Sequence, residues 1–404
     1  MNIVEGSQVP REIPPPKRNN LVQYKGGGYN NIIQRIKYLI AFQSVLGINR
    51  MYLIDCHSCA KRFCLTYDIL VVISNVIVIF IGGFFSATQA LFRNTVAIEY
   101  LLLAICALIL QRKPLTKFFS YLQSFDETLN ISDDIKLTSP IRLYVYGIIE
   151  ILLYNFFEQM LFLSYGIETY ELQYSMYAAY SGIVIHDAEI IFFSVLLIMV
   201  SRRLRVLKAH VAKIFSLQID KDSSEEINKL EELSKKVNLD VSSLHKAYDS
   251  LYKCSLQLNS VITFPIIIML VTAGFSTILI LKNLISVLQT QQYQNTTKVI
   301  TMIGIARSLK YIALLMIPCY FSNVTKIQVD VILTLLHDVL NNNNNQLDKV
   351  ERRKLKAFSQ LCRDNAFEYQ LWGIARLDMS LPLSYTSLCT TYLIIFVQFS
   401  KFIS

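Results

Sequence analysis

The chain has 404 residues, of which 53% are hydrophobic and only 17% are charged, and its mean hydropathy is +0.39. Soluble domains carry about 25% charged residues, so this composition excludes an ordinary soluble protein and favours one that crosses a membrane repeatedly. The net charge of +9 is spread over separate loops and does not indicate a nucleic-acid partner.

Residues 1–66 begin with a polar stretch that lacks the features of a cleavable signal peptide, so we expect a cytosolic tail followed by a pre-membrane helix. Apolar runs of bilayer-spanning length then recur along the chain. They predict seven transmembrane helices, at roughly residues 67–85, 94–110, 142–166, 176–200, 261–282, 298–321 and 379–402. The expected fold class is an all-α membrane protein.

The Lys and Arg residues predict how these helices are oriented. Of the 39, 33 lie in the N-terminal tail and in residues 111–142, 201–260 and 322–378, whereas only four lie on the opposite side. By the positive-inside rule, the N-terminus is cytosolic and the C-terminus extracellular. Asn295 of an Asn-Thr-Thr sequon then lies in an outer loop and is expected to be glycosylated. This topology is the reverse of a G-protein-coupled receptor.

The long cytosolic stretches are expected to be helical. One stripe in the 201–260 extension repeats with heptad spacing, and its apolar or aromatic members include Ile227, Leu230, Val237, Val241, Leu244, Tyr248 and Leu251. Such a stripe needs a partner helix, supplied either by the same chain or by another subunit. The chain is thus divided into residues 1–66, membrane helices 67–200, extension 201–260, membrane helices 261–321, anchor helices 322–378, and the last helix with a short extracellular tail, 379–404.

Two opposite charges are predicted at equal depth in the membrane. Asp187 lies about 15 Å along its helix from Tyr177, and Arg307 lies about 14 Å from Lys298. Either charge alone is costly in the bilayer, so we expect the two to pair.

Aromatic residues on the same helix face turn this pair into a candidate ligand site. We expect a polar floor beneath aromatic walls, extended by Lys310, with His186 in the same network. The alternative is a purely structural ion pair. The candidate ligand-binding residues are Glu158, Tyr177, Tyr180, Asp187 and Arg307.

The last thirty residues resemble insect gustatory receptors. The final helix of that family carries Thr-Tyr, five hydrophobic residues and Gln-Phe, a pattern that Thr391 to Phe399 match at every position. Gly373 and Asp378 match upstream, whereas Ala375 stands where an aromatic residue is usual. Asp378 is also the residue type expected to cap the final helix.

The resemblance implies a ligand-gated, non-selective cation channel, homotetrameric or heterotetrameric, in the plasma membrane of sensory neuron dendrites. Its partners are a small-molecule tastant and membrane lipid, with no cofactor. Phe399 is then the constriction, Gln398 lines the pore or bonds between subunits, and Thr391 and Tyr392 pack the pore helix against its neighbours. For Gln398, the alternative is a helix–helix hydrogen bond away from the pore.

The ligand class and two other function classes stay open. Leu393 stands where the main sugar-receptor branch often has Glu, which favours a bitter plant compound over fructose or another sugar. A transporter and a non-sensing partner subunit are the alternatives, although no inverted repeat supports the first. The run Cys56-His57-Ser58-Cys59 lacks a second cluster at metal spacing, so no metal site is expected, and no catalytic motif suggests an enzyme.

Overall fold

The computed structural model describes residues 29–54, 58–82, 87–129, 170–215, 240–290, 295–342 and 348–403, with positions 131, 147, 149, 153–157 and 160. These residues are mostly helical. The helices are α1 (Tyr29–Val45), the 3-10 turn η1 (Met51–Leu53), α2 (Ser58–Gly82), α3 (Ala87–Ile105), the π-helical turn η2 (Cys106–Leu110), α4 (Arg112–Thr128), α6 (Tyr170–Ile214), α8 (Val241–Thr290), α9 (Asn295–Asn342), α10 (Lys349–Asp364) and α11 (Ser380–Ile403). The strands are β1 (Gln370–Leu371) and β2 (Ala375–Arg376).

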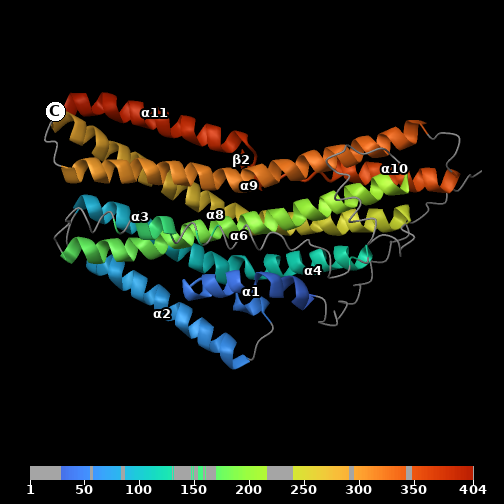
Figure 1. Ribbon diagram of the computed structural model, residues 1–404, viewed down its shortest axis with the longest axis horizontal. Coiled ribbons are helices and arrows are strands. Elements are labelled where there is room, and N and C mark those ends of the chain that lie inside the picture. Colours follow the sequence, from blue (N-terminus) through green and yellow to red (C-terminus); the bar gives the residue numbers. More distant parts are fainter. Residues whose placement is uncertain are drawn as a thin grey trace, which may run out of the picture.

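The long helices run side by side along the longest axis of the molecule (Figure 1). Helices α6, α8 and α9 contain 45, 50 and 48 residues. At 1.5 Å per residue each is about 68–75 Å long, more than twice the roughly 30 Å of a bilayer core. Each therefore continues well beyond the membrane, toward the end of the molecule where α10 lies.

The described residues contain three helices that are long and apolar enough to cross a membrane alone: Gly182–Ile214, Val241–Leu279 and Ile305–Asn341. The pair Asn94–Leu110 and Arg112–Thr128, bent by 59°, makes a fourth if it is counted as one span. Six of the seven predicted crossings coincide with helices. The third, 142–166, falls mainly outside the described residues, and the count of seven stays a prediction.

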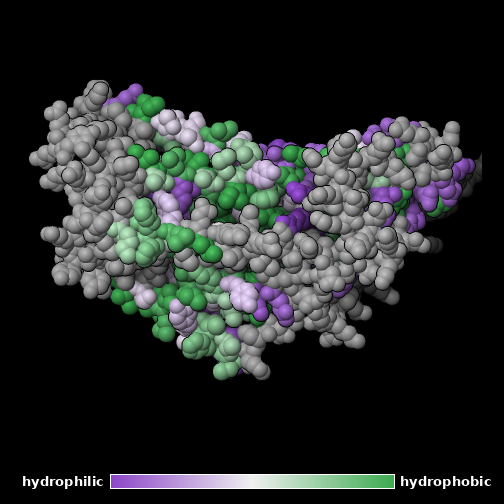
Figure 2. All heavy atoms as spheres, viewed as in Figure 1, coloured by the Kyte–Doolittle hydropathy of each residue, from purple (hydrophilic) through white to green (hydrophobic). Residues whose placement is uncertain are grey.

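Most of the segments that charge assigns to one side of the membrane gather at one end, whereas α1 lies nearer the middle (Figure 1). Helix α4, the end of α6, the start of α8, the end of α9 and α10 all meet at the right of Figure 1. Hydrophilic residues are concentrated at this end in Figure 2, and hydrophobic ones cover the middle of the visible face and α2.

The heptad stripe finds its partners within its own chain. Val241, Leu244, Tyr248 and Leu251 are all buried in α8, which packs on α4 and α10. The Tyr248 ring meets the Phe358 ring edge-on, with centroids 5.9 Å apart, and its hydroxyl donates to a backbone carbonyl after α10. An intramolecular bundle therefore accounts for these positions, whereas the earlier part of the stripe lies outside the described residues.

A tight hairpin joins this bundle to the last helix. Strands β1 and β2 are antiparallel, and the turn between them places Trp372 and Gly373 at φ 50° and 70°, the left-handed region that glycine tolerates best. The backbone N–H of Gln370 in β1 donates to Asn259 Oδ1 of α8 at 3.0 Å. The hairpin thus fixes the start of α11 against α8.

Asp378 caps α11, as the sequence predicts. Its Oδ1 accepts from the backbone N–H of Ser380 at 2.9 Å and from the Ser380 hydroxyl at 2.5 Å. These bonds satisfy a backbone donor that the first turn of a helix leaves unpaired.

We expect Asp378→Ala to lower the stability of the start of α11 by about 1 kcal/mol, because the capping acceptor is lost. The measurement is the thermal midpoint of the detergent-solubilised protein. Asp378→Asn is the matched control, since its amide oxygen accepts the same bond, and it is expected to resemble the unmodified protein. An equal loss in both variants contradicts a capping role.

Candidate functional site

Helix α6 lies at the centre of the molecule and carries three titratable residues within four positions. Every side chain from residue 182 to residue 200 is buried, so each charge on this segment needs a partner on a neighbouring helix. His186, Asp187 and Glu189 differ by about 100° and 200° around the helix axis and therefore point to three different neighbours. His186 meets a partner on α3, Asp187 meets one on α9, and Glu189 meets one between α1 and α2.

Asp187 forms an ion pair with Lys310 of α9. The Lys310 Nζ lies 2.8 Å from Asp187 Oδ2, and Asn155 Nδ2 donates to the same oxygen at 3.4 Å. The carboxylate is fully buried, and the ammonium lies 4.9 Å from the centroid of the Tyr154 ring and 5.4 Å from that of Tyr311. A buried charge pair framed by two aromatic rings is an arrangement that can orient a small polar ligand.

The expected partner of Asp187 was Arg307, and here the sequence prediction needs correction. The helix is the predicted one, but the ion pair that the structure gives Asp187 is with Lys310, three residues further along α9. Counting residues at 1.5 Å each locates a side chain only to within about one turn, and the flexible lysine stem spans that difference.

The side chains of three other predicted ligand residues are not among those that the structure describes. Glu158 lies outside the described residues. Tyr177 and Tyr180 lie in α6, but their side chains are not described. Arg307 is partly buried in α9, and Asp187 lies with the partners given above.

His186 pairs with Glu99 rather than joining Asp187. Its Nδ1 lies 2.5 Å from Glu99 Oε1 of α3, and its ring packs on that of Tyr311 with centroids 4.9 Å apart. Because Tyr311 also lies near Lys310, the two pairs share one aromatic neighbour and form a continuous polar layer across α3, α6 and α9.

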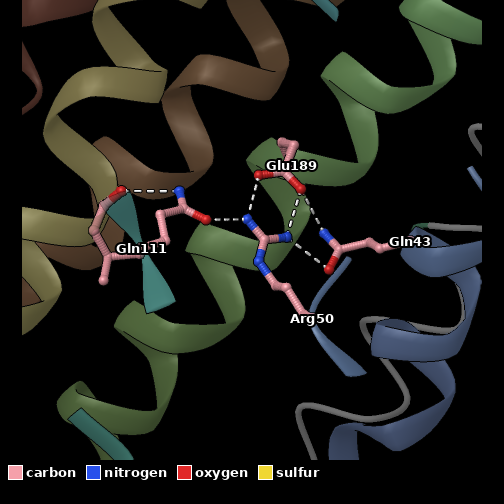
Figure 3. A network of polar contacts seen from close by, with 5 residues as sticks. Gln43, Arg50, Gln111 and Glu189 are labelled. Carbon is pink, nitrogen blue, oxygen red and sulfur yellow. Dashed lines mark hydrogen bonds and ion pairs between the residues drawn. The ribbon is translucent and has the colours of Figure 1, made fainter. Parts of the chain in front are cut away.

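Glu189 makes the most buried ion pair that the structure gives, with Arg50 (Figure 3). The Arg50 Nη1 donates to Oε1 at 2.6 Å and Nη2 to Oε2 at 2.8 Å, and the two side chains are 0% and 2% exposed. Gln43 of α1 bridges them, accepting from Arg50 and donating to Glu189 at 2.9 Å. The guanidinium also stacks 4.1 Å from the ring centroid of Phe192.

Gln111 connects this pair to a proline position in α8 (Figure 3). Its Oε1 accepts from Arg50, and its Nε2 donates to the backbone carbonyl of Val261 at 3.1 Å. Val261 is four residues before Pro265, which lacks an N–H and so leaves that carbonyl without its helical donor. Gln111 itself stands at the 59° bend between η2 and α4. One side chain thus lies at the bend before α4 and also satisfies the carbonyl that Pro265 leaves unpaired in α8.

The Arg50 network was missed by sequence reasoning. Arg50 reads there as one of many basic residues in a cytosolic tail, and its partner Glu189 is 139 positions away. Glu189 itself carried a signal, since an acidic residue in an apolar span needs a partner. The identity of that partner depends on which helices pack together.

A small cavity lies just below this polar layer, between α6, α8, α9 and α11. Its volume is about 20 Å³, room for roughly one water molecule. The walls are formed by His186, Ile190, Phe193, Ile266, Met269, Leu270, Ala273, Tyr311, Leu315, Pro318 and Tyr385. The cavity therefore joins the polar layer to the last helix.

The final helix places its predicted motif on an exposed surface. Thr391 and Gln398 are exposed, and 51% of Tyr392 is exposed, so the packing of Thr391 and Tyr392 against neighbouring helices stays a prediction. The side chain of Phe399 is not described. Among the described residues no group of His, Cys, Asp or Glu is arranged to hold a metal; Cys56 and His57 lie outside them.

Comparisons with known proteins agree with this architecture. Residues 36–403 match the family model described as 7tm Chemosensory receptor. The fold is similar to that of the insect olfactory receptor OR5 from Machilis hrabei, solved in complex with eugenol and without it. The TM-scores are 0.66 and 0.63 and the identities 14% and 16%, over 92% of this chain and 100% of the other. No curated protein sequence gives a match.

Proposed function

The chain belongs to the 7tm chemosensory receptor family, and from this premise we propose that it is a gustatory receptor that acts as a ligand-gated, non-selective cation channel. We further propose that its ligand is a bitter plant compound. The match of Thr391 to Phe399 to the gustatory pattern supports the gustatory type, and Leu393 supports a ligand other than a main-branch sugar.

The observation that carries the channel proposal is the exposure of α11. This apolar helix packs on α8 and α9 at one edge of the molecule (Figure 1) and leaves large side chains uncovered, among them Leu383, which is 74% exposed. The amide of Gln398 is exposed as well, although amides in hydrocarbon need a partner or water. Assembly of several copies around α11 covers the apolar side chains and gives the amide a partner or water, as a tetramer with a central pore does.

The proposed ligand site is the polar layer beside Asp187 and Lys310. Tyr154 and Tyr311 flank the ammonium group of Lys310. The predicted residues Tyr177 and Tyr180 lie nearer the N-terminal end of α6 than Asp187 does. Flat aromatic faces with a few directed polar groups suit small plant metabolites. Eugenol, the compound in one OR5 structure, is a small molecule of this size class.

Charge orients this channel in the membrane. We propose that the end bearing α10 is the cytosolic anchor, with residues 201–260 and 322–378 forming most of it, and that α11 runs outward to an extracellular C-terminus. Asn295, at the start of α9, then lies outside the cell and is available for glycosylation. This placement fits a plasma-membrane receptor of sensory dendrites.

The proposal is tested by expressing the chain alone and recording from excised patches while alkaloids, glycosides and sugars are applied in turn. We expect unitary current steps with one of them. Gln398→Leu is expected to lower the unitary conductance several-fold, because an apolar side chain replaces an amide that contacts passing hydrated cations.

Ser74→Ala is the matched control, since Ser74 is an exposed polar residue of α2, remote from α11, and conductance should be unchanged. Unaltered conductance in Gln398→Leu contradicts its pore position. Saturable uptake without current steps identifies a transporter instead, and surface expression without any response identifies a partner subunit.

A further inference from the structure

We propose that the cavity between α6, α8, α9 and α11 is a second ligand site, which adjoins the polar layer at His186 and Tyr311, takes a compact neutral aromatic molecule and inhibits the channel. The inference rests on the proposed channel function for its inhibitory effect, but not for binding. Tyr385 supplies the wall on the α11 side, and Ala273 and Met269 belong to the α8 side.

The lining determines the class of ligand. Its residues are mainly aliphatic or aromatic, with His186, Tyr311 and Tyr385 as the polar members, and no Asp, Glu, Lys or Arg is among them. The buried Tyr385 hydroxyl lies beside Thr277 and Cys389, and within the described part of the chain it forms no hydrogen bond of standard geometry. An apolar ring with one hydroxyl, such as a monocyclic phenol, matches this combination.

The cavity must expand to admit such a molecule. Its volume is about 20 Å³, whereas a cavity that binds benzene is about 150 Å³. Two features of the walls permit expansion: the lining passes Pro265 of α8 and includes Pro318 of α9, and prolines interrupt the hydrogen-bond ladder of a helix. The flexible Met269 can also change rotamer.

Expansion displaces α11 in a defined direction. Tyr385 packs against α8, where a Cβ added to Gly274 would lie 3.6 Å from Tyr385 Cε2. The cavity is therefore on the inner side of α11, and its exposed face, with Leu388 and Tyr392, is on the outer side. A molecule that widens the cavity pushes α11 outward, toward the other copies around the pore axis, and narrows the pore.

Binding is tested on the purified full-length chain with 4-ethylphenol as the probe. We expect a saturable rise of several degrees in the thermal midpoint, and an affinity about fivefold weaker in Tyr385→Phe because one hydrogen bond is lost. Ala273→Phe fills the cavity and is expected to abolish the shift. Val271→Phe is the matched control: it adds the same ring to α8 on a side chain that is 63% exposed, and it should keep the shift.

A diazirine analogue of 4-ethylphenol tests the unmodified chain, so the conclusion holds even if Ala273→Phe fails to fold. We expect cross-links on α8 near Met269 and on α11 near Tyr385. No thermal shift, or labelling spread over the exposed face of α2, overturns the site.

The inhibitory effect is measured separately. In excised patches the probe is expected to reduce agonist-evoked current at least tenfold, and Ala273→Phe to reduce it without probe while Val271→Phe does not. Binding with unchanged currents overturns the inhibitory role alone. Binding in a chain that shows no current under any condition counts against the channel proposal and leaves the site standing.

Discussion

Arg50→Met is expected to remove most of the folded receptor from the cell surface. The substitution leaves Glu189 fully buried without its cation, and breaking a buried pair in this way costs about 3–5 kcal/mol. The total stability of a protein domain is only about 5–15 kcal/mol, so the loss is a large share of it. Gln43 and Gln111 each lose a hydrogen bond in addition.

Surface biotinylation and size-exclusion profiles of the solubilised protein measure this effect. Arg50→Lys keeps the charge but not the two parallel bonds to the carboxylate, and an intermediate level is expected. Lys253→Met is the matched control. It breaks the ion pair between Lys253, whose side chain is 49% exposed, and Asp249, whose side chain is 35% exposed. Such surface pairs contribute at most about 1 kcal/mol to the free energy of unfolding. Equal surface levels for Arg50→Met and Lys253→Met would falsify the central role of Arg50.

Asp187→Asn is expected to abolish agonist-evoked current while the receptor still reaches the surface. Asparagine keeps the size of the side chain and an oxygen that accepts from Lys310. The Lys310 side chain is 12% exposed and also lies beside the Tyr154 and Tyr311 rings, so the loss of stability is smaller than in Arg50→Met and the packing of α6 on α9 survives. The charge that fixes the ammonium is lost, and a hydrogen bond involving a charged group contributes about 1.5–3 kcal/mol, or ten- to hundredfold in affinity. Arg307→Gln is expected to have the same effect if Arg307 also meets the ligand.

A charge exchange separates a ligand contact from a purely structural pair. In the double variant Asp187→Lys with Lys310→Asp, the pair can reform in the opposite sense and restore surface expression. We expect currents to stay absent, because the ligand then meets the wrong charge at each position. Normal currents in the exchanged variant, or in Asp187→Asn at normal surface level, refute a ligand contact.

Most of the helical layout could be predicted from the sequence because it depends on local patterns. Apolar run length located α6, α8 and α9, and heptad spacing identified Leu244 and Tyr248 as buried. The Asp378 cap followed from residue type and position. Each of these inferences needs only residues that are near one another in the chain.

Contacts between distant segments could not be predicted in the same way. Pro265 in α8 predicts that the Val261 carbonyl lacks its helical donor. The sequence pattern does not predict that Gln111, 150 positions earlier, donates the hydrogen bond to this carbonyl. The choice of Lys310 over Arg307 depends on rotation and reach of side chains on two packed helices. Tertiary packing decides such contacts, and helical periodicity carries no information about which helices become neighbours.

The complete burial of residues 182–200 of α6 has a mechanical consequence. Rotating this helix by one residue, about 100°, would carry His186, Asp187 and Glu189 away from their partners together, at a cost of several kcal/mol for each buried pair. Helix α6 is therefore expected to resist rotation about its own axis. In the proposed channel, the movement that opens or closes the pore is then expected around α6, in α11, whose outer face is exposed.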